Sequence, residues 1–201
     1  MKERPILFSG PMVRAILEGR KTMTRRVVKL RHGADVVVVN GQVWKPARVD
    51  YAGYVDCPYG QPGDRLWVRE TLRAKDGFMV YAADDGRIDC DGLDWPACIE
   101  PRKTIVSIHM PRWASRLTLE ITGVRVERLQ GISAADAQAE GLDFVPDGAA
   151  AHGIKGLATS WSNDPRKSYR ALWESINGPG SWEANPWVWV VEFKLVGNGG
   201  V

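Results

Sequence analysis

The sequence predicts a mixed α/β fold, mainly β, in which a small curved or closed sheet is decorated by two or three short helices. Segments with strand character outnumber segments with helical periodicity, and the helical segments are short. In residues 116–129, apolar and polar residues alternate, and the alternation changes phase once, as at a β-bulge. Bulges bend long strands around barrels, so this segment favours a small β-barrel.

The composition is that of an ordinary globular protein. The chain has 201 residues, 44% apolar and 25% charged, which suits one domain over residues 1–201. No apolar run approaches the roughly 18 residues of a membrane span, and no signal-peptide segment follows residue 5, so we expect a cytoplasmic protein without membrane contact. The cysteines, Cys57, Cys90 and Cys98, are odd in number and lack CxxC spacing, so we expect neither a disulfide framework nor a metal site.

The N-terminal third begins with a short amphipathic helix. Pro11 suits its first turn and Gly19 suits its end, which predicts a helix over residues 11–18. The basic residues 20–26 include two threonines and lead into two valines, a composition that favours an extended segment. Asn40-Gly41 favours a tight turn, so residues 35–44 are interpreted as a hairpin.

The central segments carry the clearest strand patterns. Residues 65–69 and 78–82 are expected to be strands, and the apolar phase of the long strand shifts at Thr122-Gly123. If a bulge lies there, five apolar residues of this strand face the core: Leu117, Leu119, Ile121, Val124 and Val126.

Two helices and a strand are expected in the C-terminal third. Ser133 begins a capping-box-like segment that runs to Glu140, and Gly141 is placed to end that helix. A further helix starts at Asp164-Pro165, and residues 187–193 form a β-rich run. Residues 143–163 are rich in Gly, Ala and Ser, so we expect a mobile loop there.

The basic charge is concentrated at the N-terminal end. Residues 1–31 hold nine Lys and Arg against two Glu, a net charge of +7, and residues 32–201 carry −4. Such a patch favours a phosphate-bearing or nucleic-acid-like partner, and a solvated basic face is the alternative interpretation.

Three groups of residues could carry chemistry. Lys21 and Thr24 combine a base with a hydroxyl nucleophile, because neighbouring arginines lower the pKa of a lysine; a solvated basic turn is the alternative. Glu140, at the end of an alanine-rich helix, could project into a cleft and shuttle a proton, or be solvated. His109, Arg112 and Trp113 combine an imidazole, a guanidinium and an indole, which are suited to stack on a nucleobase and to form hydrogen bonds with it. A structural role for the lone histidine is the alternative.

Five segments of the chain together resemble the ASCH domain family: Gly19-Arg20-Lys21-Thr22-Met23-Thr24-Arg25-Arg26, Gly63 to Arg69, Leu117 to Val126, Ala137 to Gly141 and Val190 to Lys194. That family has a PUA-like β-barrel and is related to RNA-binding domains. The chain is similar to the longer ASCH proteins commonly encoded by bacteriophages and prophages. By this resemblance, residues 30–60, 72–105 and 143–163 are loop insertions in a single domain.

The resemblance also implies an activity. A small bacterial member of the superfamily is an amidohydrolase that removes acyl groups from the exocyclic amine of cytidine, and its lysine, threonine and glutamate correspond to Lys21, Thr24 and Glu140. We therefore expect a metal-independent amidohydrolase that needs no cofactor and acts on a modified nucleoside. Lys21 would be the general base, Thr24 the nucleophile or water-orienting hydroxyl, and Glu140 the group that orients Lys21 and protonates the leaving amine.

Substrate-binding roles are expected for further polar residues: Arg20, Thr22, Arg26, Glu70 and His109. Amide hydrolysis passes through an oxyanion, and backbone N–H groups of residues 22–24 or the Arg26 side chain are candidate donors. The alternative function is an RNA-binding or ribonuclease-like RNA-processing module, whose partner is RNA or single-stranded nucleic acid. An interaction protein with a relict site is a third interpretation.

Overall fold

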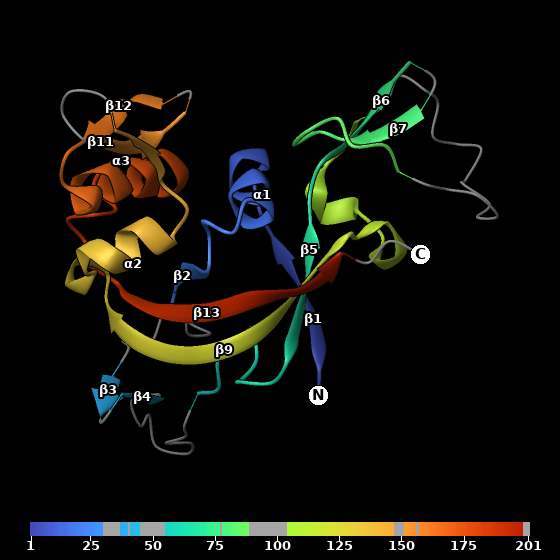
Figure 1. The fold of residues 1–201 in the computed structure, drawn as a ribbon. Coiled ribbons are helices and arrows are strands. Elements are labelled where there is room, and N and C mark those ends of the chain that lie inside the picture. Colours follow the sequence, from blue (N-terminus) through green and yellow to red (C-terminus); the bar gives the residue numbers. More distant parts are fainter. Residues whose placement is uncertain are drawn as a thin grey trace.

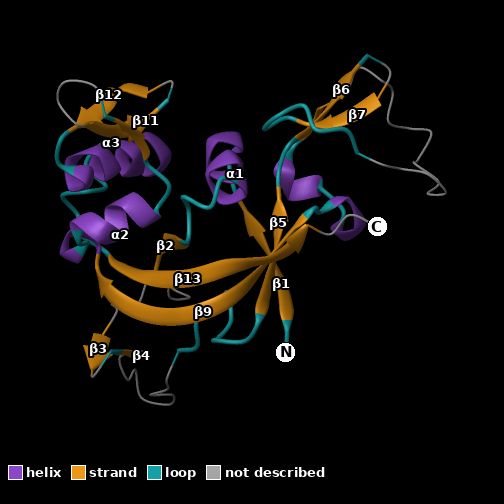
Figure 2. Ribbon diagram, in the orientation of Figure 1, coloured by secondary structure: helices purple, strands orange, loops and turns teal. Residues whose placement is uncertain are grey.

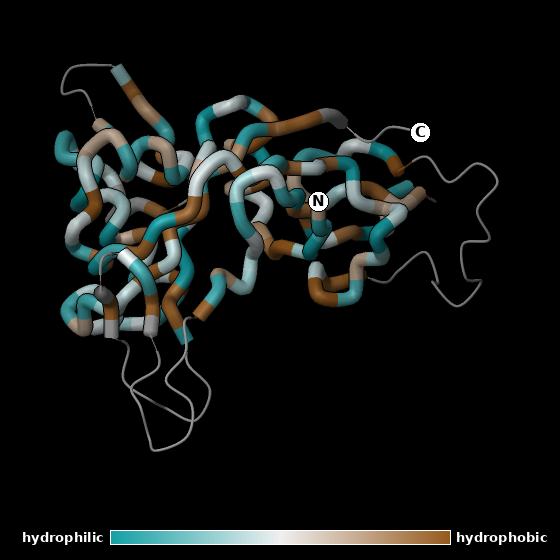
Figure 3. The backbone as a smooth tube through the Cα atoms, turned by 90° about the horizontal axis from the view of Figure 1, so that it is seen from below, coloured by the Kyte–Doolittle hydropathy of each residue, from teal (hydrophilic) through white to brown (hydrophobic). Residues whose placement is uncertain are grey.

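The computed structural model describes residues 1–29, 37–39, 41–44, 55–76, 78–88, 104–146, 151–155 and 157–198. The described part is mixed α/β and mainly β, with three α-helices and several mostly antiparallel sheets (Figure 2). Along the coloured part of the backbone, short hydrophobic and hydrophilic stretches alternate (Figure 3). This pattern is expected of strands and helices that each bury one face.

A five-stranded sheet forms the centre of the molecule. Its order is β1 (Glu3–Leu7), β5 (Arg65–Arg69), β9 (Leu117–Arg128), β13 (Trp187–Asn198) and β2 (Met23–Val27). β1 and β5 are parallel, and every other neighbouring pair is antiparallel. The long strands β9 and β13 curve together beneath the helices (Figure 1).

The predicted bulge in the long strand is confirmed. Gly123 pairs with Glu192 and Ile121 pairs with Phe193, which leaves Thr122 as the extra residue. Leu117, Leu119 and Ile121 are fully buried on one side of it, and the half-buried Val124 and Val126 pack against the same core on the other. The phase change therefore keeps both halves of the strand directed at one core.

The closed barrel is not formed by the described strands. β1 and β2 are the two edges of the sheet, and no pairing among these strands joins them. The helix α1 (Gly10–Leu17) connects the two edges on the concave side of β9 and β13 (Figure 1). Its buried Val13 and Ile16 belong to the main core, so a helix covers the curved face where further strand pairing would close a barrel.

A second core lies on the other face of β13, against α2 (Ala134–Ala139) and α3 (Pro165–Asn177). Val188 and Val190 point into this core, and Trp189 and Val191 point into the main core. Burial on both faces explains why residues 187–191 read as a continuous apolar run. The expected caps are present: Asp136 N–H donates to the Ser133 hydroxyl at 3.0 Å, and Arg166 N–H donates to the Asp164 carboxylate at 3.0 Å.

Smaller sheets occupy the segments interpreted as insertions. They are the hairpin β3 (Val37–Val39) and β4 (Gln42–Trp44); the sheet of β6 (Leu72–Lys75), β7 (Phe78–Tyr81) and β8 (Thr104–Ile105); and the sheet of β10 (Asp143–Val145), β11 (Ala151–Ile154) and β12 (Leu157–Ser162). Asn40 of the predicted turn lies outside the described residues, as do residues 45–54 and 89–103.

The expectation of a mobile loop over residues 143–163 is wrong for the described part of that segment. Its three strands pair antiparallel, and the Ser168 hydroxyl of α3 donates to the backbone carbonyl of His152 at 2.7 Å. A Cβ on Gly153 would lie 2.4 Å from the Trp161 ring, so the small residue makes room for an aromatic side chain across the strands. The Gly, Ala and Ser residues that suggested a loop instead allow these strands to pack closely.

Candidate active site

The site begins where α1 ends. Gly19 adopts a φ of +72°, and the backbone N–H groups of Arg20 and Lys21 both donate to the carbonyl of Ala15, at 2.9 and 3.0 Å. This helix termination turns the chain back beneath α1 before β2 starts at Met23. The turn directs the side chain of Lys21 into the protein interior, where its exposed fraction is zero.

The end of α2 meets the same point. Gly141 has a φ of +94°, and a Cβ added there would lie 2.9 Å from the Cβ atoms of both Ala15 and Lys21. Glycine is therefore needed at this position for its conformation and for the close approach of the two helix ends. Lys21 and Glu140 form an isolated antiparallel bridge, and Thr22 N–H donates to the Ala139 carbonyl at 2.9 Å.

The Lys21 ammonium is fully hydrogen-bonded. Its Nζ donates to the Glu140 carboxylate at 2.8 Å, to the Glu140 backbone carbonyl at 2.8 Å and to the Met23 carbonyl at 2.9 Å. An ammonium has three protons, so these acceptors satisfy it completely. The predicted contact between Lys21 and Glu140 is present. Thr24 is the second residue of β2, where it pairs with Val191, and it is not among the acceptors of Lys21 Nζ.

Burial governs the charge state of Lys21. Desolvation lowers the pKa of its ammonium, and the neighbouring Glu140 carboxylate offsets only part of that effect. The Glu140 side chain is 3% exposed. The pair is therefore a buried ion pair whose lysine releases its proton more readily than an exposed lysine does.

Arg25 holds the other oxygen of Glu140. Its side chain is completely buried, and its guanidinium contacts Glu140 at 3.3 Å, Glu127 at 2.6 Å and Asp136 at 2.7 Å. Burial opposes the charge, yet the Glu140 and Glu127 carboxylates together hold the pKa of Arg25 above its ordinary value. Glu140 is thus clamped between two buried cations.

Tyr169 of α3 completes the surroundings of Glu140. Its ring lies 5.9 Å from the Arg25 guanidinium. Burial raises the pKa of the Tyr169 phenol well above 10, and the Glu140 charge raises it further. The phenol therefore stays protonated as a hydrogen-bond donor beside this carboxylate.

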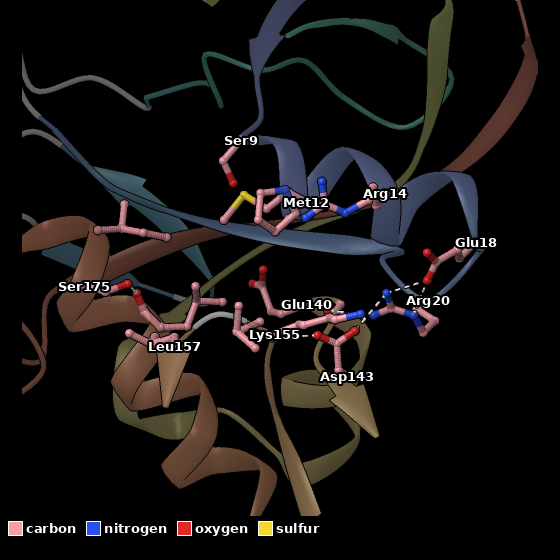
Figure 4. Close-up of a pocket in the computed structure, with 15 residues that line it drawn as sticks. Ser9, Met12, Arg14, Glu18, Arg20, Glu140, Asp143, Lys155, Leu157 and Ser175 are labelled. Atoms are coloured by element: carbon pink, nitrogen blue, oxygen red, sulfur yellow. Dashed lines mark hydrogen bonds and ion pairs between the residues drawn. The ribbon is translucent and has the colours of Figure 1, made fainter. Parts of the chain in front are cut away.

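Two cavities adjoin the ion pair. The α1–β12 cavity, of about 530 Å³, is lined by α1, the β11–β12 segment and α3 (Figure 4). The β2–α3 cavity, of about 440 Å³, is lined by β2, residues 58–59 and α3. Both volumes are in the range of small-molecule sites. The residues common to both cavities are Met12, Glu140, Leu172 and Ile176, so Glu140 is the charged side chain they share.

The predicted polar residues divide between these cavities. Thr24 and Arg26 line the β2–α3 cavity. Arg20 lines the α1–β12 cavity, where it pairs with Glu18 and with Asp143 at 3.0 Å (Figure 4). The exposed Thr22 lines neither cavity and lies in a third depression, of about 590 Å³, which also includes Arg20. The GRKTMTRR segment thus contributes side chains to three separate surfaces.

The assignments of Glu70 and His109 to this site need correction, because neither residue lines the two cavities. Glu70 is buried and forms a bidentate pair with Arg116 at 2.9 and 3.0 Å, which already occupies both of its oxygens. His109 is exposed on a short 3₁₀ helix, Ser107–His109, next to the β6–β8 sheet. Figure 1 shows α1 between that region and α2, so the expected wall of residues 107–113 beside Lys21 is not formed.

Part of the basic N-terminal patch pairs with acidic residues from later in the chain. Lys21 pairs with Glu140, Arg25 with three carboxylates, and Arg4 with Asp64 at 3.3 Å. Lys2, Arg14, Arg26 and Lys29 form no ion pair with the described residues, so part of the net charge of +7 in residues 1–31 stays unpaired. The pairing weakens the argument from charge for a phosphate-bearing partner.

Sequence reasoning missed the role of Arg25 and Tyr169. Arg25 belongs to a run of basic residues. The signal that separates it from its neighbours is strand alternation, which directs its side chain to the other face of the strand from Thr24 and Arg26. Tyr169 lies on the apolar face of a helix, where an aromatic residue is normally part of the core. Both contact Glu140, a relationship that no local pattern contains.

Among the described residues, no three His, Cys, Asp or Glu side chains are arranged to hold a metal ion. Cys57 is buried and free, and Cys90 and Cys98 lie outside the described residues. No helix in the described ranges combines the length and apolar character of a membrane span. Comparison of the chain with protein-family models, curated proteins and solved structures gives no match.

Proposed function

We propose that this protein is a hydrolase that cleaves the amide of an acylated nucleoside amine, with Glu140 at the reacting centre. The observation that carries the proposal is the setting of the Glu140 carboxylate. Lys21 and Arg25 each bind one of its oxygens, and Glu140 lines two cavities of small-molecule size. A carboxylate held in a fixed orientation at a cavity junction is suited to proton transfer.

Thr24 is the proposed nucleophile or water-orienting hydroxyl. It is buried and lines the β2–α3 cavity together with Glu140. Attack of Thr24 Oγ1 or a water on the acyl carbon forms a tetrahedral oxyanion, and Glu140 accepts the proton that the nucleophile loses. The C–N bond then breaks, and Glu140 returns this proton to the departing amine. With Thr24 as nucleophile, water hydrolyses the resulting ester.

Lys21 acts through Glu140 in this mechanism. The Lys21 side chain has no exposed surface, and all three protons of its Nζ are engaged in hydrogen bonds. This geometry argues against Lys21 as a general base that contacts the substrate directly. Its charge and its hydrogen bond fix the orientation of the carboxylate. Lys21 is therefore a positioning residue, whereas Thr24 and Glu140 are proposed to touch the substrate.

Arg26 is the proposed donor to the oxyanion. Its Nη2 donates to the Leu7 carbonyl at 2.8 Å, but its Nε is buried without a hydrogen-bond partner among the described residues. Arg26 lines the cavity that contains Thr24, and its positive charge is suited to stabilise an oxyanion formed there.

The fold that accompanies this proposal is a variant of the ASCH, PUA-like barrel. The curved sheet with a central bulge supports it, and α1 occupies the concave side in place of a closing strand pair. On this view the small sheets of residues 72–105 and 143–163 are additions around the common sheet.

The test is a hydrolysis screen of the full chain against acetylated cytidine and other acylated nucleosides, with chromatographic detection of the released amine. We expect turnover of at least one substrate. Thr24→Val removes the hydroxyl at nearly constant volume and should lower kcat by about 100-fold or more, with Thr24→Ser retaining activity. Thr118→Val, a change on β9 away from both cavities, is the matched control and should leave kcat unchanged.

A wild-type chain that hydrolyses none of these amides contradicts the proposal. If that inactive chain instead binds RNA with an affinity that falls steeply with salt, the RNA-binding interpretation replaces it.

A further inference from the structure

The two cavities that meet at Glu140 differ in the charge of their walls. The β2–α3 cavity is lined by three basic residues and one acidic residue: Arg25, Arg26, Lys29 and Glu140. The α1–β12 cavity is lined by three charged residues of each sign: Arg14, Arg20 and Lys155, and Glu18, Glu140 and Asp143. The charges therefore balance in the α1–β12 cavity, whereas the β2–α3 cavity has an excess of two positive charges.

The excess charge belongs to Arg26 and Lys29. Arg25 and Glu140 form an ion pair with each other, and each of them has further ion-pair partners. Arg26 and Lys29 form no ion pair with the described residues; Arg26 is half-buried and Lys29 is exposed. Positive charges without a counterion attract an anion, and a cavity with low-dielectric walls strengthens this attraction.

The neutral polar side chains of the cavity are compatible with an anion. Two of them, Tyr169 and Asn177, already have partners within the protein. The hydroxyls of Thr24 and Tyr59 remain, and both can donate to the oxygen atoms of a ligand. Burial raises the pKa of the Tyr59 phenol although the Arg26 charge opposes this shift, so the phenol keeps its proton at neutral pH.

The rest of the wall is apolar, and the cavity is larger than an acetyl group requires. The apolar residues of the wall are Met12, Val27, Pro58, Leu172, Trp173 and Ile176. Methylene groups gain free energy when such side chains remove them from water. The volume of about 440 Å³ leaves room for several methylene groups beyond an acyl carbonyl. A methylene chain that ends in an anion therefore fits both the apolar wall and the charge.

We propose that the β2–α3 cavity selects an acyl group that ends in a carboxylate, and that Arg26 and Lys29 recognise this negative charge. The preference for an anion rests on the cavity itself. Its placement on the acyl group rests on the proposed function, because Thr24, the proposed nucleophile, lines this cavity. Attack on the acyl carbon adds an oxyanion to the terminal carboxylate, so two negative charges meet two unpaired cations. Hydrolysis consumes one water and releases the nucleoside amine and a dicarboxylate.

The first experiment compares two cytidines that carry an alkyl group on the exocyclic amine and contain no amide to hydrolyse. One bears a 3-carboxypropyl group, and the other bears a 4-methylpentyl group of nearly the same shape without the charge. In calorimetric titrations of the wild-type chain at neutral pH and low salt, the carboxylate probe should bind about tenfold more tightly, which corresponds to roughly 1.4 kcal/mol. Added salt should reduce this preference, because it screens the attraction.

Variants then locate the charge that is responsible. Lys29→Gln should reduce the preference from about tenfold to about threefold, because an ion pair with an exposed lysine contributes little. Lys155→Gln is the matched control: Lys155 is also exposed and forms no ion pair with the described residues, but it lines the α1–β12 cavity. This control should keep the wild-type preference, and the uncharged probe should bind equally to all three chains.

A third probe tests the other source of negative charge. It is the 5′-monophosphate of the 4-methylpentyl cytidine, and we expect Lys29→Gln to leave its affinity unchanged. If the phosphate instead strengthens binding and Lys29→Gln removes that gain, the anion belongs to the nucleotide and the inference is wrong.

Equal binding of the first two probes by the wild-type chain also overturns the inference. So does a preference that Lys29→Gln leaves intact or that Lys155→Gln removes, because the anion then lies outside the β2–α3 cavity. A preference that depends on Lys29, in a chain that hydrolyses no amide, refutes the hydrolase and supports the anion site. Hydrolysis of acetylated cytidine by a chain that binds both probes equally does the reverse.

Discussion

Lys21 Nζ donates to both the backbone carbonyl and the side-chain carboxylate of Glu140, each at 2.8 Å, although the two residues are 119 positions apart in the chain. The carbonyl is one of the groups left unpaired at the end of α2, so the ammonium closes the helix and fixes the carboxylate together. The Gly19 and Gly141 turns make this approach possible, because each reverses the chain directly after a helix.

Removing either charge of this pair should destabilise the fold. Lys21→Met leaves Glu140 with Arg25 alone, and Glu140→Gln leaves two buried cations without their shared carboxylate. Each should lower the free energy of unfolding by roughly 3–5 kcal/mol, and the double variant should lose less than the sum. Urea denaturation measures these values. Glu120→Gln, which breaks an exposed pair with Lys194, is the control and should cost about 0–1 kcal/mol.

The same variants should behave as one unit in catalysis. Lys21→Met and Glu140→Gln should each lower turnover of acetylated cytidine by about 100-fold or more, and the double variant should be little slower than either. Because Lys21 acts by holding the Glu140 carboxylate, the residual activity of Lys21→Met should also show a displaced pH profile. Full activity in Lys21→Met, measured on folded protein, is the result that contradicts this role.

The close approach of the two helix ends can be tested by adding one methyl group. Gly19→Ala and Gly141→Ala both place alanine at a positive φ after a helix, which costs roughly 1–2 kcal/mol. Only at Gly141 does the new Cβ meet other atoms, at 2.9 Å from Ala15 and Lys21, so that variant should lose roughly 1–3 kcal/mol more. Equal losses for the two variants, by thermal or urea unfolding, contradict the close contact.

The lowered pKa of Lys21 gives the stability a defined pH dependence. Between its folded-state pKa and 10.5, the unfolded chain binds more protons at this residue, so its contribution to stability rises with pH. Below the folded-state pKa both states keep the proton and the contribution is constant. The wild type should gain stability relative to Lys21→Met/Glu140→Gln as the pH rises toward 10.5. A difference that shrinks over this window contradicts the assignment.

Glu70 and His109 should prove independent of the site. Glu70→Gln breaks the buried pair with Arg116 and should lower stability by about 3 kcal/mol while kcat at a temperature where the chain is folded stays unchanged. His109→Ala changes an exposed side chain and should alter stability by less than about 0.5 kcal/mol. A selective loss of turnover in either variant returns that residue to the site.

Local patterns predicted most of the main elements. Gly19 and Gly141 marked the ends of α1 and α2, and the broken alternation at Thr122-Gly123 marked the bulge, because caps and bulges depend on residues adjacent in the chain. The strands β10–β12 escaped prediction because their Gly, Ala and Ser residues resemble a loop. The small size of these residues allows close packing against Trp161 and α3. Sequence periodicity does not predict that these partners lie next to the strands.

The sequence by itself therefore determined the mainly β class, the helix ends and the candidacy of Lys21, Thr24 and Glu140. Only the tertiary structure decided that Glu70 is bound to Arg116, that Arg25 and Tyr169 surround Glu140, and that the described strands leave the sheet open around α1. The physical reason is the range of the interactions. Caps, turns and bulges involve a few consecutive residues, whereas ion-pair partners, desolvation and cavities depend on which distant segments packing brings together.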